Sequence, residues 1–354
     1  MPLTPQELQN AATYNFQQYA DGEPVDQITH KLKVYDWFLS HKKPASFTGG
    51  VFNEKVRLSL DSNFQRIHGA DQLEFNSRDT YRPAPYQHYE AFDGFYLVER
   101  ELVDRGITIT RNSDGKVSGA TREEAQIIVD VMKENWTVLK DGLQQNLAYD
   151  MLRDGTHDTK AVPGLDLLVS TTPAVGTIGG LDASVITPWQ NYANMGISTA
   201  TPGNLVDAME IATRATITKG KRGAPDAYFC GSLFLDALRR DARATQDLHV
   251  SVPGSGGVTL DPSTKAIHWG GVPVIWDPTF DALDDILGAI TYPWKKRCYG
   301  LNSKAITMRP VRGRWMQKVI PEPVYNRFVH YYGMHTDYSI TTDQRSSHFV
   351  ISIA

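Results

Sequence analysis

The longest helical pattern of this sequence runs from residue 121 to residue 154 and constrains the fold more than any other feature. Thr121 and Glu124 have the spacing of a capping box at its start. Gly155 follows its last residue, where glycine commonly ends a helix. Between these ends, apolar residues recur at intervals of three and four: Ile128, Met132, Trp136, Leu139, Leu143, Leu147 and Met151. The pattern predicts a helix of roughly 34 residues and ~50 Å, interrupted only by Gly142, across which other elements pack.

The N-terminal residues, 1–45, predict an arm with helical character. A helix-like stretch at 5–19 is broken by the turn-forming run DGEP at 21–24. A second helix is predicted within residues 28–41. Its apolar face would hold Ile28, Leu32, Tyr35 and Leu39.

Residues 46–100 have the pattern of a long hairpin. Val56, Leu58 and Leu60 alternate with charged or polar neighbours, which is typical of a half-buried strand. The returning stretch TYRPAPYQHYEAFDGFYLV is extended and rich in aromatic residues, with prolines at 83 and 85. Proline cannot donate to a sheet ladder, so we expect an edge or an unsupported hairpin. A hairpin this polar cannot form a core alone, and we expect it to lie on other protein, such as a second subunit.

Residues 161–299 mix short helices and strands. A helix is predicted over 201–220, with Leu205, Met209, Ala212 and Ala215 on one face. Residues 225–242 predict a strand, a turn and a helix, 251–263 a flexible loop, and 266–278 a turn-linked strand pair. The chain from 289 onward should be mostly β. We find no internal repeat or linker, so the fold class is α+β with interleaved domains.

Composition excludes several classes of protein. The 354 residues are 41% hydrophobic and 21% charged, as in ordinary soluble proteins, and the net charge of −4 argues against an overall electrostatic grip on nucleic acid. No apolar run is long enough to span a membrane, and the N-terminus lacks a signal-peptide pattern, so we expect synthesis in the cytoplasm. Cys230 and Cys298 are interpreted as buried, reduced thiols. The basic clusters at 219–222, 295–297 and 309–314 are interpreted as solvated faces or salt-bridge partners.

The run TPAVGTIGGLDAS at 172–184 is the first candidate for a ligand site. Gly176, Gly179 and Gly180 could hold a phosphate on backbone amides, but the lysine and hydroxyl of a phosphate-binding loop are missing. The residues that follow, Thr187 and Pro188, do not begin a helix that could support a phosphate. We interpret the glycines as structural.

Other chemical groups are weaker candidates. Ser255 lies in PGSGG, which misses the nucleophile-elbow pattern. His157 and Asp158 have no nearby nucleophile and are interpreted as a loop. His330 and His335 should point to opposite faces of an extended segment, without the partners of a zinc site. The acidic cluster of Asp281, Asp284 and Asp285 could bind a divalent cation but is interpreted as a solvated turn. No catalytic, cofactor-binding or metal-binding residue is therefore predicted, and the chain is not expected to be an enzyme.

The order of these parts resembles the major capsid protein of tailed bacteriophages, whose fold is named after a Hong Kong phage and is also found in encapsulin compartments. LQQNLAYDMLRDGT is similar to the end of the family's spine helix, and VPGLDLLVSTTPAVGTIGGLDASVITPWQNY to the segment that follows it. APDAYFCGSLFLDALRR, GGVPVIWDP and CYGLNSKAITMRPVRGRW are similar to later parts of the family pattern. Gln190 stands where the family commonly has an arginine. The resemblance covers nearly the whole chain.

The resemblance implies five parts. Residues 1–45 would be the N-terminal arm and 46–100 an extended loop over a neighbouring subunit. Residues 101–160 would form the peripheral domain with the spine helix 121–154, and 161–299 the axial domain. Residues 300–354 would return as strands to the peripheral domain. The glycines of 172–184 would turn the chain between the spine helix and the axial domain.

The implied function is structural: pentamers and hexamers of the chain would form an icosahedral shell that encloses double-stranded DNA without sequence-specific contact. A separate scaffolding protein, a portal and a decoration protein are possible partners, no membrane is involved, and the shell would assemble in the cytoplasm of a host bacterium. Two alternatives stay open: an encapsulin-like compartment, and a small-oligomer metabolic enzyme that uses the 174–180 loop or the 281–285 acids. Lys55 is a candidate for inter-subunit cross-linking by its location alone, and the short segment before the hairpin argues against a fused, cleaved scaffold.

Overall fold

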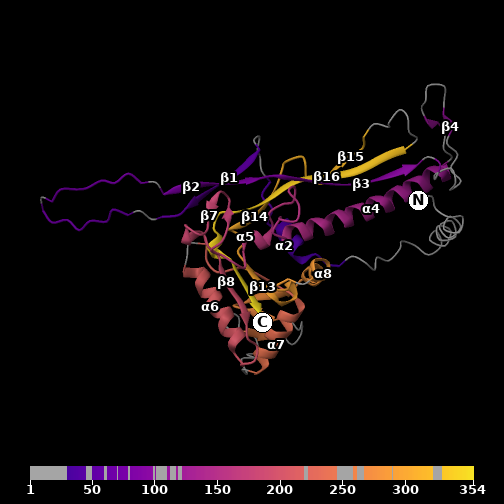
Figure 1. The fold of residues 1–354 in the computed structure, drawn as a ribbon. Helices are drawn as coiled ribbons and strands as arrows, with labels where there is room; N and C mark the ends of the chain where they lie inside the picture. Colours follow the sequence, from indigo (N-terminus) through magenta and orange to yellow (C-terminus); the bar gives the residue numbers. More distant parts are fainter. Residues whose placement is uncertain are drawn as a thin grey trace. The chain divides into compact units, whose positions relative to one another are not determined.

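The computed structural model describes residues 30–44, 50–59, 62–69, 71–78, 80–98, 100, 110–111, 117–118, 122–218, 222–244, 258–260, 267–288, 290–321 and 329–354 (Figure 1). The chain forms two compact units that interleave along the sequence. The helix unit comprises Met1–His30, Phe92–Gln145 and Met316–His335, and the sheet unit comprises Lys31–Ala91, Asn146–Trp315 and Thr336–Ala354.

A seven-stranded sheet forms the centre of the sheet unit, in the order β10-β11-β12-β9-β13-β17-β8. Its strands are β8 (Tyr192–Ile197), β9 (Ala227–Cys230), β10 (Val258–Leu260), β11 (Ile267–Trp269), β12 (Val272–Trp276), β13 (Arg297–Leu301) and β17 (Phe349–Ile353). Neighbours are antiparallel except for the parallel pairs β12–β9 and β17–β8. Every residue of β9, β13 and β17 is buried, which is typical of strands covered on both faces.

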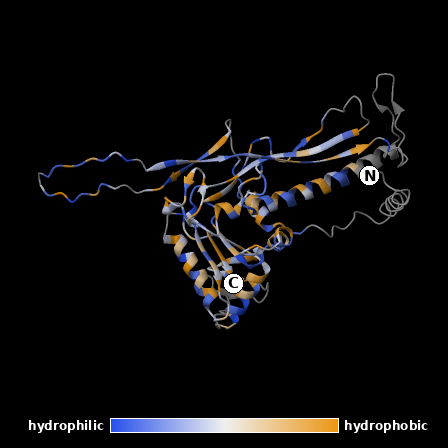
Figure 2. Ribbon diagram, in the orientation of Figure 1, coloured by the Kyte–Doolittle hydropathy of each residue, from blue (hydrophilic) through white to orange (hydrophobic). Residues whose placement is uncertain are grey.

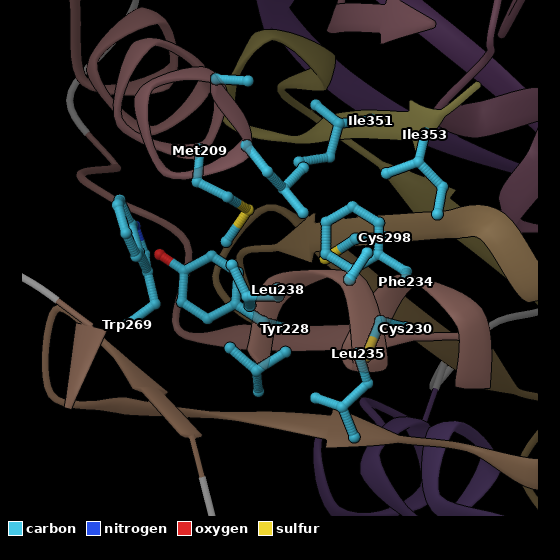
Figure 3. Packing of buried hydrophobic residues seen from close by; sticks show 14 of the residues in the cluster. Met209, Tyr228, Cys230, Phe234, Leu235, Leu238, Trp269, Cys298, Ile351 and Ile353 are labelled. Carbon is cyan, nitrogen blue, oxygen red and sulfur yellow. The ribbon is translucent and has the colours of Figure 1, made fainter. Parts of the chain in front are cut away.

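Helices cover both faces of this sheet. On one face, α6 (Asn204–Thr218) and α7 (Ser232–Ala244) share a core with alternate residues of the central strands, among them Tyr228, Cys230 and Cys298 (Figure 3). On the other face, Phe229 packs against α2 (Lys33–Ser40) and Tyr299 against α8 (Pro278–Leu287). Because successive side chains of a strand point to opposite faces, adjacent residues of β9 and of β13 contact different helices.

Two carboxylates fix the starts of three of these helices. Asp241 of α7 accepts hydrogen bonds from the backbone N–H groups of Gly203, Leu205 and Val206 at the start of α6. Asp277 caps α8 by accepting from Thr279 N at 2.8 Å, and its second oxygen accepts from Val34 N of α2 at 2.7 Å. These bonds satisfy N–H groups that a helix leaves without internal partners.

The long helix is confirmed as α4, Arg122–Leu152. The predicted apolar stripe is buried at Leu139, Leu143, Leu147 and Met151, and Gly155 has the left-handed φ of +82° expected after a helix end. Thr121, and the side chains of Glu124 and Ile128, lie outside the described residues.

The helix unit contains an aromatic cluster between α4 and strands. Phe95 of β3 (Tyr89–Val98) stacks on Tyr332 of β16 (Val329–Thr342), with 5.3 Å between ring centroids, and both rings meet Trp136 of α4 edge-on. β3 and β15 (Gln317–Val319) both pair with β16, and Lys318 of β15 lies over the Trp136 ring at 4.9 Å. In the sheet unit, β14 (Ile306–Pro310) pairs with residues 338–342 of β16.

The short elements are α5 (Leu165–Leu168), β4 (Thr110–Arg111), β5 (Val117–Ser118), and the 3₁₀ turns η1 (Thr187–Trp189), η2 (Trp294–Lys296) and η3 (Arg345–Ser347). Among the helices of the described residues, none has the length and apolar character needed to cross a bilayer.

Three details of the expected fold are wrong. The helix within 28–41 begins at Lys33 and buries Val34, Tyr35 and Phe38, so its face is rotated from the predicted one. The stretch 281–285 is part of α8 and not a turn, because Asp277 and Pro278 start a helix there. The last strand, β17, was expected to return with the C-terminal strands to the peripheral domain, but it lies between β13 and β8 in the seven-stranded sheet, where all five of its residues are buried.

Candidate functional site: the ribbon and its base

The sheet unit carries a two-stranded ribbon, most of whose residues are exposed. β1 (Val51–Arg57) and β2 (Tyr81–Gln87) pair antiparallel from Val51↔Gln87 to Arg57↔Tyr81. Among the described residues, no third strand pairs with either. The predicted hairpin is therefore confirmed over residues 51–87 as a strand pair with two free edges, a structure that is at best marginally stable without further contacts. The end of the predicted returning strand differs, because residues 89–98 form β3, which pairs with β16.

One face of the ribbon supplies these contacts. Phe52 and Tyr86 are register partners and both are buried, as are Val56 and Ala84 on the same face. Pro83 and Pro85 alternate with the buried residues and are exposed. Because side chains alternate along a strand, one face of the ribbon is buried against the protein and the other is exposed, and the prolines lie on the exposed face.

Polar contacts fasten the base of the ribbon to β14 and β16. The Glu54 carboxylate pairs with Arg309 Nη2 at 2.5 Å and accepts a hydrogen bond from Thr341 Oγ1 at 2.9 Å. The Tyr86 hydroxyl donates to the backbone oxygen of Thr342 at 2.9 Å. Burial raises the pKa of Tyr86, so the hydroxyl keeps its proton and stays a donor.

The glycine run that opened the search for a ligand site lies against this base. β6 (Thr177–Ile178) and β7 (Leu181–Asp182) form a small hairpin whose turn is Gly179-Gly180, with φ of +57° and +68°. A β-carbon on Gly179 would lie 3.0 Å from the Ala84 β-carbon and from the Tyr86 hydroxyl oxygen. One on Gly180 would lie 3.2 Å from Pro85. The glycines serve the tight turn and also allow β2 to approach it closely.

A buried arginine holds the segment after this hairpin. Arg345 is fully buried and donates to the backbone oxygens of Leu168 at 2.8 Å and Trp189 at 3.1 Å, and to Asn191 Oδ1 at 3.0 Å. All three acceptors are neutral, and burial lowers the pKa of Arg345 to about 10. Trp189 in turn donates from its indole N–H to Ile178 O at 3.1 Å. The C-terminal segment thereby fixes the chain that carries the glycine turn.

The distal loop extends the ribbon. Of its residues the structure describes 58–59, 62–69, 71–78 and 80, and most of these are exposed. Side chains, not a backbone ladder, connect its two arms: Gln65 donates to Glu74 O at 3.2 Å and accepts from Glu74 N at 3.2 Å, while Asn63 donates to Glu74 O at 2.8 Å. Hydrophobic residues are interspersed with hydrophilic ones along this loop (Figure 2). Its large exposed apolar side chains are Phe64, Ile67, Leu73 and Phe75, with Phe64 at 79% and Phe75 at 89% exposure.

Each of the three acidic candidates, Asp281, Asp284 and Asp285, has a hydrogen-bond or ion-pair partner. Asp281 accepts from Ser232 Oγ and from the Trp276 indole N–H, at 2.9 and 2.8 Å. Asp284 accepts from the backbone N–H groups of Trp294 and Lys295, both at 2.7 Å. Asp285 pairs with the Lys295 ammonium at 2.8 Å. The three acids therefore hold α7, β12 and η2 around α8.

The histidine candidates are also separated. His157 does not face Asp158 but pairs with Asp150 at 3.4 Å, and burial raises the pKa of Asp150 against the opposing effect of His157. His330 and His335 both lie in β16, the extended segment that was predicted. Ser255 lies outside the described residues. Gln190, which stands where the capsid family commonly has an arginine, donates from its side chain to Ala183 O at 2.7 Å.

The basic clusters supply ion pairs within the sheet unit. Arg222 pairs with Asp343, Arg314 with Asp337 at 2.7 Å, and the largely buried Arg297 with Asp166 at 2.8 Å. This confirms the salt-bridge interpretation for these arginines. Lys219 and Lys221 lie outside the described residues.

Sequence reasoning missed the residues that anchor the ribbon. Glu54 was passed over as a polar residue of an alternating strand, and Arg345 lies in a polar run, TDQRSSH, that resembles a loop. His348 was also missed: it is fully buried, and its Nδ1 accepts from Asn302 N at 3.1 Å. Burial, and then the nearby Arg345, lower the pKa of His348 to about 3. A polar residue directly before the apolar strand FVISI was the available signal.

Comparisons with known proteins find similar folds but no similar family model or curated sequence. No protein-family model and no curated protein sequence matches the chain. A chain of the cyanophage A-1(L) capsid asymmetric unit matches with a TM-score of 0.62 over 93% of this chain and 94% of that chain, at 13% identity. A chain of Microbacterium phage Oxtober96 matches with a TM-score of 0.54 over 96% and 99%, at 11% identity. A chain of the capsid of a native GTA particle matches with 0.53 over 94% of each, at 9% identity.

These likenesses concern the fold. The chain has the mixed helix-and-sheet fold of phage capsid proteins over nearly its whole length, which confirms the fold that the sequence resemblance implied.

Proposed function

We propose that this chain is the major capsid protein of a tailed bacteriophage, a structural subunit that assembles with copies of itself into an icosahedral shell. The exposed distal loop of the ribbon, on a fold shared with phage capsids, carries this proposal. Under it the chain has no enzymatic role.

The loop supports self-assembly because it exposes what a folded protein normally covers. Phe75 and Phe64 are the two most exposed large apolar side chains of the described residues, and Ile67 and Leu73 lie in the same loop. Burial of apolar surface contributes roughly 25 cal/mol per Å², and clustered exposed apolar side chains mark protein–protein contacts. The occupant that fits a shell is a second copy of the chain, on which the loop lies.

The way the base of the ribbon is fastened also supports a role in self-assembly. Glu54, Tyr86 and the glycine turn fasten the base of the ribbon to the rest of the sheet unit. The side-chain hydrogen bonds of the distal loop, from Asn63 and Gln65 to Glu74 and between His68 and Asp71, stay within the loop. One sequence must close rings of five and of six copies through head-to-tail contacts. A ribbon with a fixed base and an adaptable distal loop meets that requirement.

The remaining assignments follow the capsid family. Residues 1–45 are the arm, 46–100 the extended loop, 101–160 the peripheral domain and 161–299 the axial domain around the five-fold and six-fold centres. A separate scaffolding protein directs assembly in the host cytoplasm, and a portal and a decoration protein join the shell of the virion. The net charge of −4 suits a shell that encloses double-stranded DNA without binding it strongly through electrostatic attraction.

The size of the particles formed by the purified chain tests the proposal. Light scattering after size exclusion, with electron micrographs of the leading fraction, should show shells, tubes, or rings of five and six chains. A monomer or dimer that is unchanged by concentration and by a scaffolding partner would contradict it. Nucleic acid inside particles from infected cells indicates a virion, and an enzyme in its place indicates an encapsulin-like compartment.

A matched pair of variants tests the role of the loop. Phe64→Ser together with Phe75→Ser should abolish large particles, because the apolar contact between copies is lost. Asn76→Ser, in the same exposed arm, should assemble like the wild type. Equal assembly by both variants would show that the loop is not the contact.

A further inference from the structure

The only two cysteines of the chain are register partners in neighbouring strands. Cys230 ends β9, Cys298 lies in β13, and the antiparallel ladder places them directly opposite each other. Both side chains belong to the core cluster on the α6 and α7 face of the sheet, so they point to the same side (Figure 3).

The ladder also determines how close the two residues lie. Gly231 N donates to Arg297 O at 3.1 Å, which makes Gly231 and Arg297 a hydrogen-bonded pair. Such pairs alternate with non-hydrogen-bonded ones along an antiparallel ladder, so Cys230 and Cys298 form a non-hydrogen-bonded pair. The α-carbons of such a pair are about 4.5 Å apart, inside the range of roughly 4.4–6.8 Å that a disulfide spans.

The surroundings of the pair are buried and apolar. Both thiols are fully buried, and Phe234 and Leu238 of α7 belong to the same cluster. Cys230 Sγ donates to Ile275 O at 3.7 Å. Burial raises the pKa of both thiols. At Cys230 the nearby Arg239 opposes this rise, and at Cys298 the neighbouring Cys230 adds to it. The thiols therefore stay protonated, and they react only when the strands open.

We propose that Cys230 and Cys298 are a latent redox pair that closes into a cross-strand disulfide between β9 and β13 when the protein meets a peroxide. One thiol, as its thiolate, attacks a peroxide oxygen and becomes a sulfenic acid, releasing water. The sulfur of the second cysteine then attacks the sulfenic sulfur, and a second water leaves. Two thiols lose two protons and two electrons, which convert one hydrogen peroxide into two waters.

The disulfide would join strands that are distant in sequence. It would close the chain segment 231–297, which contains α7, β12 and α8, and so restrict the unfolded state. A shell that leaves a reducing cell enters surroundings in which disulfides persist; this consequence rests on the proposed function, whereas the disulfide itself does not.

Thiol counting on the full-length protein tests the proposal. The reduced protein is treated with hydrogen peroxide in a urea series below its unfolding transition, then unfolded, alkylated with iodoacetamide and weighed by mass spectrometry. We expect two alkyl groups per chain before peroxide, none after it, and two again after dithiothreitol, with oxidation faster as urea rises. The peptides that contain Cys230 and Cys298 should be linked within one chain.

Single variants separate the disulfide from other oxidations. Cys230→Ser and Cys298→Ser should each lose the reducible intrachain link. Two alkylatable thiols after peroxide at every urea concentration, a loss that dithiothreitol does not reverse, or a link between two chains would each overturn the proposal. Should either variant not fold, the reversible loss of both wild-type thiols and the linked peptides decide it. Failure here leaves particle assembly unaffected, so it is distinguishable from failure of the proposed function.

Discussion

The seven-stranded sheet and the β1–β2 ribbon use the same strand geometry with opposite outcomes. In the sheet, both faces of β9 and β13 are covered, by α6 and α7 on one side and by α2 and α8 on the other. In the ribbon, one face at the base is anchored, and the distal loop exposes phenylalanines. A strand region is therefore stable within the single chain when other elements cover both of its faces, and forming strands is not enough by itself.

The largest effect is expected in the sheet core. Phe234→Ala removes a fully buried ring between α7 and the central strands and should lower the free energy of unfolding by about 3–5 kcal/mol. Leu233→Ala, at a neighbouring side chain that is 44% exposed, is the control, with an expected change of about 1 kcal/mol or less. Urea unfolding followed by tryptophan fluorescence measures both, and equal losses would refute the predicted contrast.

Acid should weaken the sheet through His348. Its pKa in the folded protein is lowered to about 3, whereas the unfolded chain has a histidine pKa of about 6.5. The unfolded state therefore binds an extra proton between these values, and the associated stability, complete above pH ~6.5, falls by about 1.4 kcal/mol per pH unit toward pH ~3. His348→Asn should flatten this part of the pH profile in denaturant titrations. Parallel profiles for the two proteins would exclude His348 as the cause.

The contact between the glycine turn and the ribbon is expected to matter less. Gly179 and Gly69 have nearly equal φ, +57° and +58°, but only Gly179 faces the ribbon, while nothing lies within 4 Å of a β-carbon on Gly69. Alanine at either site should cost about 1–2 kcal/mol for the left-handed backbone. Gly179→Ala should cost about 1 kcal/mol more, because Ala84 and Tyr86 must move. Thermal unfolding of the two variants measures the difference, and identical melting would place β2 away from the turn.

The smallest effect on the single chain is expected in the distal loop. Phe75→Ser removes a side chain that is 89% exposed and should change the free energy of unfolding of the unassembled protein by no more than about 0.5 kcal/mol. Particle yield, measured on the same sample by light scattering, should fall sharply. A large loss of stability before assembly would mean that the loop packs on its own chain.

How much could be predicted depended on the range of the interactions involved. α4, α6, the β9–α7 unit and the β11–β12 pair followed from apolar periods and turn residues within a few positions of each other. The helix α2 was predicted with a rotated face, since two or three turns contain too few apolar residues to fix its orientation. The acids of α8 were predicted as a turn because their partners, such as Ser232 and Trp294, lie outside the local pattern.

By itself, the sequence determined the long helix, the hairpin, the mixed domain, the structural role of the glycines and, through the order of motifs, the fold. Only the tertiary structure decided which strand the glycine turn supports, where β17 inserts and what Arg345 binds. Arg345 and its acceptor Leu168 are 177 positions apart, and Tyr86 and Thr342 are 256 apart. Periodicity reports which face of an element is buried, because neighbouring residues share that face. It carries no information about which distant segment covers the face, and that choice requires the folded path of the whole chain.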